Sequence, residues 1–249
     1  KKAITKRTKA IMPVWMYGQF PEMKEIKKVA GSIPIIEDSC PGVGSYSDGK
    51  HAGSIGDIGC FSFQGAKLLA IGEGGMLVTN SKELHDEAKL LADMYTVKEF
   101  WQEKIGYMYE MNNVSAAVGL GQLEHVEELL EKKKKIFTWY EEKLIQVFPM
   151  NIQGLNGIPN YWMTSIVVPS EKYRQNLRRH LKEKNIDTRP FFYPITKMGF
   201  HPKRYQTPIS YVFGHCGINL PSTVRLTKGE VKHVASVIKD FDDHYTERS

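Results

Sequence analysis

Lys67 is the side chain with the clearest potential for chemistry, because it stands in an almost uncharged stretch that runs from Gly56 to Asn80. An ammonium group in apolar surroundings is costly unless it is paired or neutralised. Desolvation also turns a lysine into a nucleophile toward carbonyl groups. The ordinary alternative is a lysine whose end reaches water. The neighbourhood therefore indicates either amine chemistry at Lys67 or a solvated lysine.

Two carboxylates follow an apolar run upstream of this lysine. Residues 33–36 are Ile-Pro-Ile-Ile, and Glu37 and Asp38 come directly after them. Apolar runs of this kind between helices are typical of parallel strands that are buried on both faces. Ligands of open α/β sheets sit beyond the carboxyl ends of the strands, which is where Asp38 is expected to stand. The alternative is that Asp38 only caps the next turn.

Several segments, in a consistent order, resemble the DegT/DnrJ/EryC1/StrS family of sugar aminotransferases. The segments are KAITKRTKAIMPVWMYGQFPEM, IIEDSCPGVGS, GSIGDIGCFSF, QGAK, GEGGMLVTN, IGYMYEMNNVSAAVGLGQLEHVEELL, DTRPFFYPI and INLPST. Together they extend over essentially the whole chain, which makes the resemblance far more specific than a single glycine pattern. Within the family, FQGAK and FF-Y-P are most similar to the GDP-perosamine synthase branch.

The resemblance implies an α/β fold of the fold-type I pyridoxal-phosphate (PLP) transferases. Such a fold has a mostly parallel central sheet flanked by helices, with a small α+β C-terminal domain. Residues 1–149 are then the later part of the large PLP-binding domain, whose start is missing, and residues 150–249 are the small domain. The family's glycine-threonine phosphate loop and its ring-stacking aromatic residue would lie upstream of Lys1. Family members are usually homodimers with shared active sites.

The resemblance also implies roles for three residues. Lys67 forms the Schiff base with pyridoxal 5′-phosphate, and Asp38 pairs with the pyridine nitrogen and keeps it protonated. Ser62 donates its hydroxyl to the cofactor phosphate, whereas without the resemblance it is an ordinary strand serine. Four positions depart from the usual family pattern and put cofactor affinity in question: Trp15 for histidine, Pro41 for a polar residue, Met108 for the asparagine that reaches the neighbouring subunit's cofactor, and Glu110 for arginine.

A basic residue stands among aromatic ones near the end of the chain. The segment Thr188 to Tyr193 contains Arg189 beside Pro190 and two phenylalanines. Aromatic rings suit sugar faces and bases, and a guanidinium suits a phosphate or a donor carboxylate. The alternative is an exposed structural arginine beside core phenylalanines. Arg189 and Tyr193 are therefore candidate substrate-binding residues.

The activity implied by the resemblance is a PLP-dependent aminotransferase. It would convert a nucleotide-linked 4-keto-6-deoxy sugar to the amino sugar, with glutamate as donor, in the biosynthesis of a surface polysaccharide or another glycan. A keto-deoxysugar dehydratase of the same family is the second hypothesis, but that branch has histidine at the position of Lys67. A degenerate, non-catalytic PLP-fold protein is the third, because of the four departures and the missing start.

Composition narrows the classes of function. The chain has 249 residues, a net charge of +6, and ordinary apolar (41%) and charged (25%) fractions, so we expect a soluble globular protein. Its three cysteines are far apart and its histidines form no metal-binding pattern, which favours a reducing cytoplasmic compartment and no metal. The basic run 132–135 is intermixed with glutamates, which predicts a solvated mixed-charge face and no nucleic-acid partner. No stretch is long and apolar enough for a membrane span.

The elements expected to position these residues follow from periodicity and capping signals. Strands are predicted at 10–14, 33–36, 61–63, 76–79, 161–168 and 188–193, with a possible hairpin turn at 72–75. Helices are predicted at 21–29, 81–94, 112 to about 149 and 170–183, and a further one starts at the capping box 227–230. Residues 150–160 read as a linker. The glycine turn at 72–75 has no helix after it, so we predict no Rossmann dinucleotide site.

Overall fold

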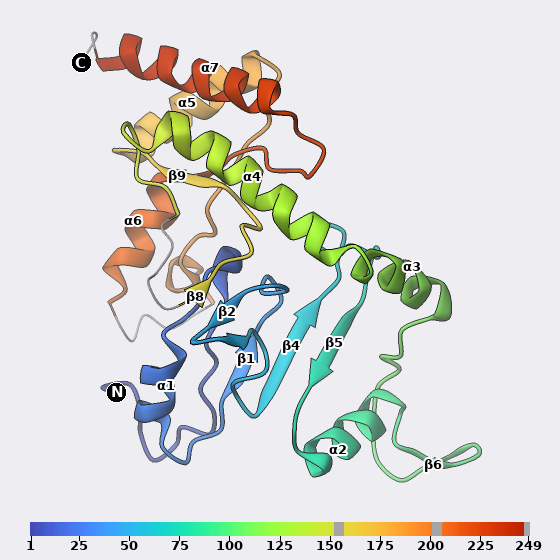
Figure 1. Ribbon diagram of the computed structural model, residues 1–249. Helices are drawn as coiled ribbons and strands as arrows, with labels where there is room; N and C mark the ends of the chain where they lie inside the picture. The colour runs from blue at the N-terminus through green and yellow to red at the C-terminus, as the bar shows by residue number, and fades with distance from the viewer. Residues whose placement is uncertain (152–156, 201–205, 247–249) are drawn as a thin grey trace. The chain divides into compact units, whose positions relative to one another are not determined.

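The computed structural model describes residues 1–151, 157–200 and 206–246, which form two compact units (Figure 1). The first unit contains residues 1–130 and 157–162, and the second contains residues 131–151 and 163–246 of the described chain. The chain therefore leaves the first unit and returns to it for one short segment. Part of the predicted linker, residues 152–156, lies outside the described residues.

The central sheet of the first unit has three strands in the order β1–β4–β5, namely β1 (Ile36–Asp38), β4 (Ile58–Ser62) and β5 (Gly75–Val78). β1 and β4 are parallel, whereas β4 and β5 are antiparallel. The predicted hairpin is therefore confirmed, but the described residues do not form the large, mostly parallel sheet that was predicted. Phe63 N–H donates to Gly74 O (2.9 Å), so the chain reverses beside β4 instead of crossing over the sheet.

The N-terminal segment that was predicted as a strand pairs with β1 only through two isolated parallel bridges, Ile11 with Ile35 and Val14 with Asp38. Pro13 lies between the bridges and has no N–H to donate, which interrupts the ladder. Its carbonyl still accepts the N–H of Asp38 at 2.9 Å. The backbone at Asp38 is therefore held on one side by this segment and on the other by β4.

A short helix and a small sheet complete the core around β1. α1 (Met23–Ala30) starts two residues later than predicted, after the 3-10 turn η1 (Met16–Gly18). Its buried residues pack with others from the first unit, and this cluster contains Trp15, Met23, Ala30, Ile35, Ala52 and Ile55. β2 (Tyr46–Ser47) pairs antiparallel with β3 (Lys50–His51) and with β8 (Gly157–Ile158). β8 therefore ties the returning segment into the first unit.

Beyond β5, the chain forms one predicted helix and one unpredicted hairpin. α2 (Lys82–Ala92) has the expected N-cap, because Ser81 Oγ accepts the N–H of Leu84 at 3.3 Å. β6 (Thr96–Lys98) and β7 (Trp101–Gln102) form a short antiparallel hairpin that no sequence pattern indicated.

The longest predicted helix is two helices, α3 (Asn113–Leu123) and α4 (Val126–Leu144). Its start is confirmed, since Asn112 Oδ1 accepts the N–H of Ser115 at 2.9 Å. The prediction of one continuous helix is wrong because the chain turns at residues 124–125, where His125 N–H donates to Gln122 O at 3.1 Å. This i→i+3 bond tightens the end of α3 and stops the regular helical pattern.

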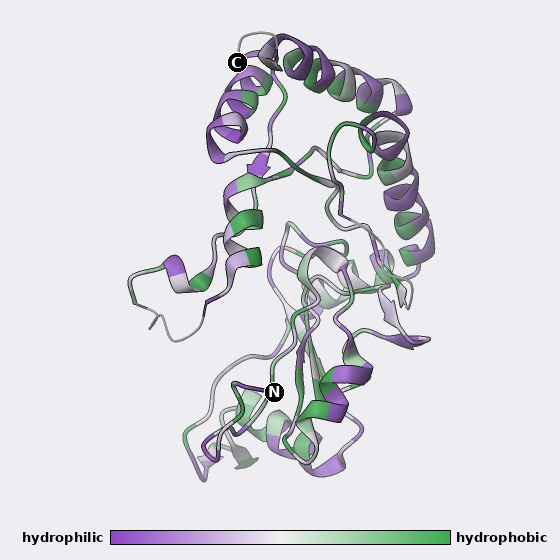
Figure 2. Ribbon diagram, turned by 90° about the vertical axis from the view of Figure 1, so that its left-hand side faces the viewer, coloured by the Kyte–Doolittle hydropathy of each residue, from purple (hydrophilic) through white to green (hydrophobic). Residues whose placement is uncertain are grey.

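The second unit is a three-stranded antiparallel sheet with helices. The strand order is β10–β11–β9, with β9 (Ser165–Val167), β10 (Arg189–Pro190) and β11 (Gly217–Asn219). β10 lies at the edge, as its proline predicted. α5 (Glu171–Glu183) and α7 (Lys228–Thr246) have the predicted starts, while η2 (Ile195–Lys197) and α6 (Pro208–Cys216) were not predicted. Figure 2 shows hydrophilic and hydrophobic residues alternating along the helix that leads to the C-terminus, as expected for a helix with one buried face.

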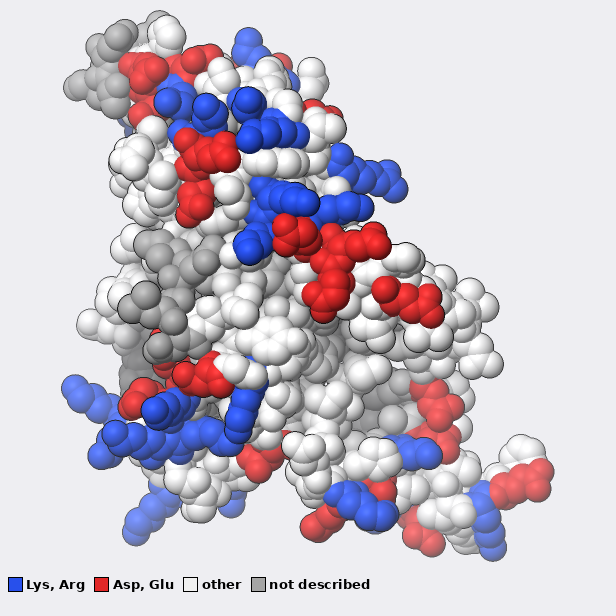
Figure 3. Space-filling model, viewed as in Figure 1, with Lys and Arg blue, Asp and Glu red and all other residues white. Residues whose placement is uncertain are grey.

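The basic run on α4 is mostly a solvated mixed-charge face, as predicted. Lys135 lies 3.9 Å from Glu131, and Figure 3 shows basic and acidic side chains side by side on this face. Lys133 is the exception, because only 8% of it is exposed and its Nζ donates to Ser222 O at 2.6 Å. Burial lowers the pKa of Lys133 from its ordinary 10.5 to about 8.

This buried lysine gives the second unit a pH-dependent stability. The folded-state pKa lies below the unfolded one, so between about pH 8 and 10.5 the unfolded state binds more protons and stability rises with pH. Relative to Lys133→Met, the wild-type protein is expected to gain stability across this window, by about 1 kcal/mol or more and at most about 3 kcal/mol. Urea unfolding of both proteins at pH 8 and pH 10 measures the gain. Equal pH dependence of the two proteins would show that Lys133 does not titrate there.

Candidate active site

Asp38 stands where the sequence placed it, at the carboxyl end of β1 and opposite Cys60 of β4. Its Oδ1 accepts the N–H of Cys40 at 3.2 Å, so Asp38 does cap the following turn. The side chain is half-buried and only one of its oxygens makes this bond. The capping role and a ligand-facing role are therefore compatible in the same carboxylate.

The thiol pKa values of two cysteines near Asp38 are raised by burial and by the charge of Asp38. Burial, together with the hydrogen bond and the charge of Asp38, raises the pKa of the Cys40 thiol to about 11, while the charge of Lys67 opposes the rise. Burial, followed by the charge of Asp38, also raises the pKa of Cys60. Both thiols therefore stay protonated at neutral pH and do not compete as nucleophiles. The charges of Asp38 and Lys67 thus both act on Cys40, so both side chains lie in the neighbourhood of this cysteine.

Lys67 lies in the loop between β4 and β5, which is closed by backbone hydrogen bonds. Gly65 N–H donates to Gly72 O at 2.9 Å, and Lys67 N–H donates to Gln64 O at 2.8 Å. The half-buried amine of Lys67 lies over the ring of Trp162, with Nζ 4.4 Å from the ring centre. The amine is therefore neither deeply buried nor simply extended into water.

The glycine turn and α3 fix the far side of this loop. Gly72 and Gly74 have φ of +90° and +157°, conformations that side chains rarely adopt, so the turn serves backbone geometry as the sequence suggested. From α3, Gln122 Nε2 donates to Ala70 O at 2.5 Å, and its Oε1 accepts Ala70 N–H at 3.0 Å. Gln122 thus holds the loop through both ends of its amide.

Ser62 ends β4 and points its hydroxyl at the start of the Lys67 loop. Ser62 Oγ accepts the N–H of Gln64 at 3.3 Å, and the side chain is half-buried. A hydroxyl that accepts one bond still has a proton to donate. Because β1 and β4 are parallel, Asp38 and Ser62 lie at the same edge of the sheet, and Lys67 belongs to the loop that leaves β4 at this edge.

The returning segment, residues 160–162, is hydrogen-bonded both to the loop after Asp38 and to the loop that carries Lys67. The sequence analysis did not identify this segment as part of the site. Asn160 Nδ2 donates to Pro41 O (2.6 Å) and Val43 O (2.8 Å), which fixes the loop after Asp38. Trp162 Nε1 donates to Ala66 O at 2.8 Å, next to Lys67. The only local signal was an Asn-Tyr-Trp sequence following a glycine- and proline-containing stretch.

One of the four departures from the family pattern, Trp15, has a structural role that depends on its side chain, whereas Pro41 takes part only through its backbone carbonyl. Trp15 is fully buried, and its Nε1 donates to Glu37 Oε2 at 2.9 Å. The carboxylate of Glu37 also accepts the N–H groups of Gly53, Ile55 and Gly56. Pro41 offers its carbonyl to the amide of Asn160. A buried acid with four donors is well satisfied, so Trp15 supports the fold beside Asp38.

The other two departures lie on the surface of the chain. Met108 is 73% exposed, so it is not a core residue in this chain. Glu110 lines a cavity of about 590 Å³ together with Glu73, Asn112 and apolar residues of β5 and α2. Neither residue contacts Asp38, Ser62 or Lys67 through a hydrogen bond or ion pair among the described residues.

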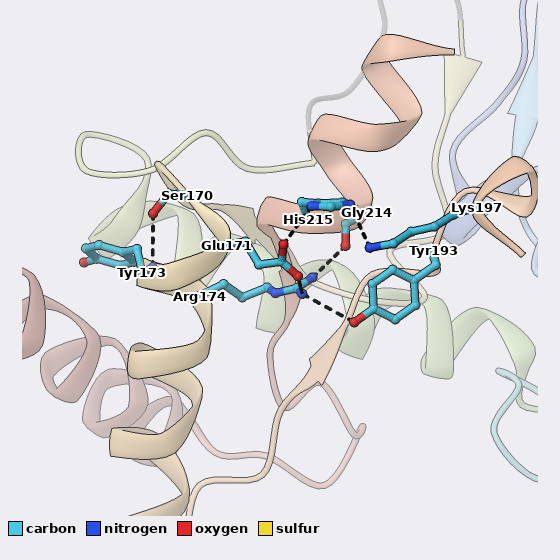
Figure 4. A network of polar contacts seen from close by, with 8 residues as sticks. All are labelled: Ser170, Glu171, Tyr173, Arg174, Tyr193, Lys197, Gly214 and His215. Carbon is cyan, nitrogen blue, oxygen red and sulfur yellow. Dashed lines mark hydrogen bonds and ion pairs between the residues drawn. The ribbon is translucent and has the colours of Figure 1, made fainter. Parts of the chain in front are cut away.

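The candidate substrate residues, Arg189 and Tyr193, belong to the second unit. Arg189 is exposed on the edge strand β10. Tyr193 is 42% exposed and lies in a network of polar contacts that Figure 4 shows. Lys197 Nζ is 5.0 Å from the centre of the Tyr193 ring, so a lysine ammonium lies over the face of this tyrosine.

The buried cation of this network is Arg174, which the sequence did not reveal (Figure 4). Arg174 donates to Gly214 O at 2.6 Å and Glu171 Oε1 at 3.3 Å, and more weakly to Tyr193 Oη at 3.5 Å. His215 bridges Glu171 Oε2 (2.8 Å) and Lys197 Nζ (3.0 Å). The network therefore fixes the position of Tyr193, while Arg189 takes no part in it.

The described residues contain no group of three or more histidine, cysteine or acidic side chains that could hold a metal ion. None of their helices is long and apolar enough to cross a membrane.

Comparison with known proteins assigns the chain to a class. Residues 1–239 match the DegT/DnrJ/EryC1/StrS aminotransferase family, and the chain belongs to that family. It is 37% identical to GDP-perosamine synthase from Escherichia coli O157:H7 over 246 residues, which cover 97% of this chain and 68% of that protein. The chain thus spans about two thirds of the length of this relative.

Solved structures share the fold. The aminotransferase TlmJ from Streptoalloteichus hindustanus superposes with a TM-score of 0.93 at 23% identity, over 98% of this chain and 69% of that one. A putative sugar aminotransferase from Streptococcus pneumoniae in its PMP form has a TM-score of 0.89 at 23% identity, over 98% and 71% of the two chains.

The family uses PLP, and the residues of the first unit fit this cofactor by the chemistry of their donors. A primary amine, a carboxylate and a hydroxyl lie half-buried at one edge of the sheet. These are the groups that can link to an aldehyde, face a pyridinium nitrogen and bind a phosphate oxygen.

Proposed function

We propose that this protein is a PLP-dependent aminotransferase that aminates a nucleotide-linked 4-keto-6-deoxy sugar, with glutamate as the amino donor. The observation that supports the proposal is that Asp38 ends β1 beside the parallel strand β4, and that the loop following β4 carries Lys67. Membership of the aminotransferase family supports the same reaction class. We further propose that the whole protein works in the cytoplasm as a homodimer with shared sites, in glycan biosynthesis.

Three residues have distinct roles at the proposed site. Lys67 supplies the amine that holds the cofactor and carries a proton at the substrate carbon. Asp38 would hold the positive charge at the ring nitrogen of the cofactor, and Ser62 would donate a hydrogen bond to its phosphate. The cofactor, when bound, supplies an electron sink for bonds at the substrate carbon. Cys40 and Cys60, whose thiol pKa values are raised, do not compete with the Lys67 amine as thiolates at neutral pH.

The competing functions are less well supported. The dehydratase hypothesis requires histidine at the position that Lys67 occupies. The degenerate-protein hypothesis rested on four departures and on the missing start, and one of the departures, Trp15, makes a side-chain contact that supports the fold beside Asp38. Met108 and Glu110 remain departures that this single chain does not explain.

The proposed substrate class draws on the relatives and on the second unit. The relative at 37% identity is a GDP-perosamine synthase, which is why we propose a GDP- or UDP-linked sugar. Tyr193, with Lys197 over its ring, offers an aromatic face beside a cation, and Arg189 adds an exposed guanidinium. Such groups suit a sugar or base face and a phosphate.

Incubation with substrates tests the proposal. Given PLP, glutamate and a GDP- or UDP-linked 4-keto-6-deoxyhexose, the whole protein is expected to form the amino sugar nucleotide and 2-oxoglutarate in equal amounts. Mass spectrometry of the sugar nucleotide measures the product, and free amino acids paired with simple 2-oxo acids are expected to react poorly. Robust exchange between common amino acids and oxo acids, without a sugar-nucleotide product, would contradict the substrate class.

A further inference from the structure

Trp162 belongs to the short segment that returns to the first unit, and it contacts the candidate active site directly. It is 5% exposed, and the centre of its ring lies 4.4 Å from Nζ of Lys67. A cation over an indole face is attracted by the ring quadrupole, and indole is the strongest of the aromatic partners. The attraction acts on the ammonium form of the lysine and not on the neutral amine.

The indole N–H holds the backbone of the same loop. Trp162 Nε1 donates to Ala66 O at 2.8 Å, one residue before Lys67. Trp162 therefore contacts the lysine at two points, with its ring face at the amine and with its N–H at the neighbouring carbonyl. A residue that only filled space in the core would require neither contact.

The position of Trp162 is itself fixed by contacts on the other side of the site. Its backbone N–H donates to Asn160 Oδ1 at 2.9 Å, and the amide of Asn160 holds the carbonyls of Pro41 and Val43. Its ring also stacks on Tyr17, with 6.3 Å between ring centres. The segment 160–162 thus connects the loop after Asp38 to the loop that carries Lys67.

We propose that Trp162 is a positioning residue for Lys67, holding the amine on its ring face whenever the lysine is not covalently attached, and keeping it at the Asp38 edge of the sheet. The proposal deepens the proposed aminotransferase function and rests on it for the meaning of Lys67. In a reaction in which the lysine is alternately attached and released, such a resting place keeps the free amine from moving away from the site.

Chemical labelling of the protein without cofactor tests the ring contact. Trp162→Phe and Trp162→Leu both remove the N–H that holds Ala66, but only the leucine variant removes the aromatic face. The amine of Lys67 is expected to react with acetic anhydride about two- to five-fold faster in the leucine variant than in the phenylalanine variant, because the ammonium form loses its partner. Peptide mass spectrometry measures the extent of acetylation of Lys67 relative to that of the other lysines.

Trp101 provides a matched control, because its ring lies 5.1 Å from Nζ of Lys98 on the exposed hairpin of the same unit. Trp101→Leu is expected to leave the labelling of Lys67 unchanged. Equal labelling of Lys67 in the leucine and phenylalanine variants of Trp162 would overturn the proposal.

A fluorescence measurement keeps the proposal testable if Trp162→Leu does not fold. Lys67→Met is expected to change the tryptophan emission of the wild-type protein but not that of Trp162→Phe, because the ammonium group perturbs only the ring that it contacts. Identical emission changes in both backgrounds would overturn the ring contact. A parallel reduction of wild-type protein with PLP and borohydride separates the two hypotheses. No adduct on Lys67 contradicts the aminotransferase function, whereas an adduct combined with unchanged labelling contradicts only the role of Trp162.

Discussion

Lys67→Arg is expected to abolish covalent attachment of pyridoxal phosphate and to lower transamination by about a thousandfold or more. A guanidinium keeps its charge at any accessible pH and cannot act as the amine nucleophile, and loss of a residue that carries a covalent step is rarely compensated. Borohydride reduction followed by peptide mapping is expected to place a pyridoxyl group on Lys67 of the wild-type protein and to find none on the corresponding peptide of the variant.

Lys82→Arg is the matched control for this experiment. Lys82 is exposed on α2 and pairs with Asp86 one helical turn along. Its replacement is expected to leave both the adduct and the activity unchanged. A pyridoxyl group on any lysine other than Lys67 would disprove the assignment.

Asp38→Asn is expected to lower turnover about a hundredfold or more while changing the free energy of unfolding by less than about 1 kcal/mol. A neutral amide no longer holds the charge at the ring nitrogen, and loss of one fixed electrostatic partner typically costs this much in rate. The amide oxygen can still accept the N–H of Cys40, so the turn after β1 is preserved. Half-reaction rates with glutamate and urea unfolding curves measure the two effects.

Asp57 is a control residue whose replacement is expected to lower stability and to leave turnover unchanged. Its Oδ2 accepts the N–H of Ile35 at 2.7 Å, a contact that supports β1 and does not involve Lys67. Asp57→Ala is expected to lose about 1–3 kcal/mol of stability and to keep the turnover of the folded fraction. A second readout checks the placement of Asp38 itself: the pKa of Cys40 is expected to fall in Asp38→Asn, because Asp38 helps to raise it.

Local patterns predicted only part of the site at the strand ends. Asp38 was found because an apolar run ends in a carboxylate, whereas Ser62 was assigned through the family resemblance and not through a local pattern. The N-caps Ser81, Asn112 and Ser170 were found, like Asp38, from local patterns, since a cap depends only on the next three residues.

The parts that sequence reasoning missed depend on contacts between distant segments. Asn160 and Trp162 act on carbonyls far upstream, and no periodicity connects such positions. Arg174 was not singled out from the sequence, and it is only 3% exposed, with its guanidinium hydrogen-bonded to Gly214 and Glu171. The turn between α3 and α4 was hidden for another reason, because the apolar spacing continues across residues 124–125.

The segment 160–162 has a consequence for how the protein is made. Trp162 meets Ala66 across 96 residues of chain, and Asn160 meets Pro41 across 119. Closing loops of this length costs conformational entropy before the new contacts can stabilise the structure. Folds that depend on such contacts therefore form slowly. During synthesis on the ribosome, Lys67 emerges long before its aromatic partner does. The candidate active site therefore stays incomplete until translation has passed residue 162, and it is among the last parts of the first unit to take shape.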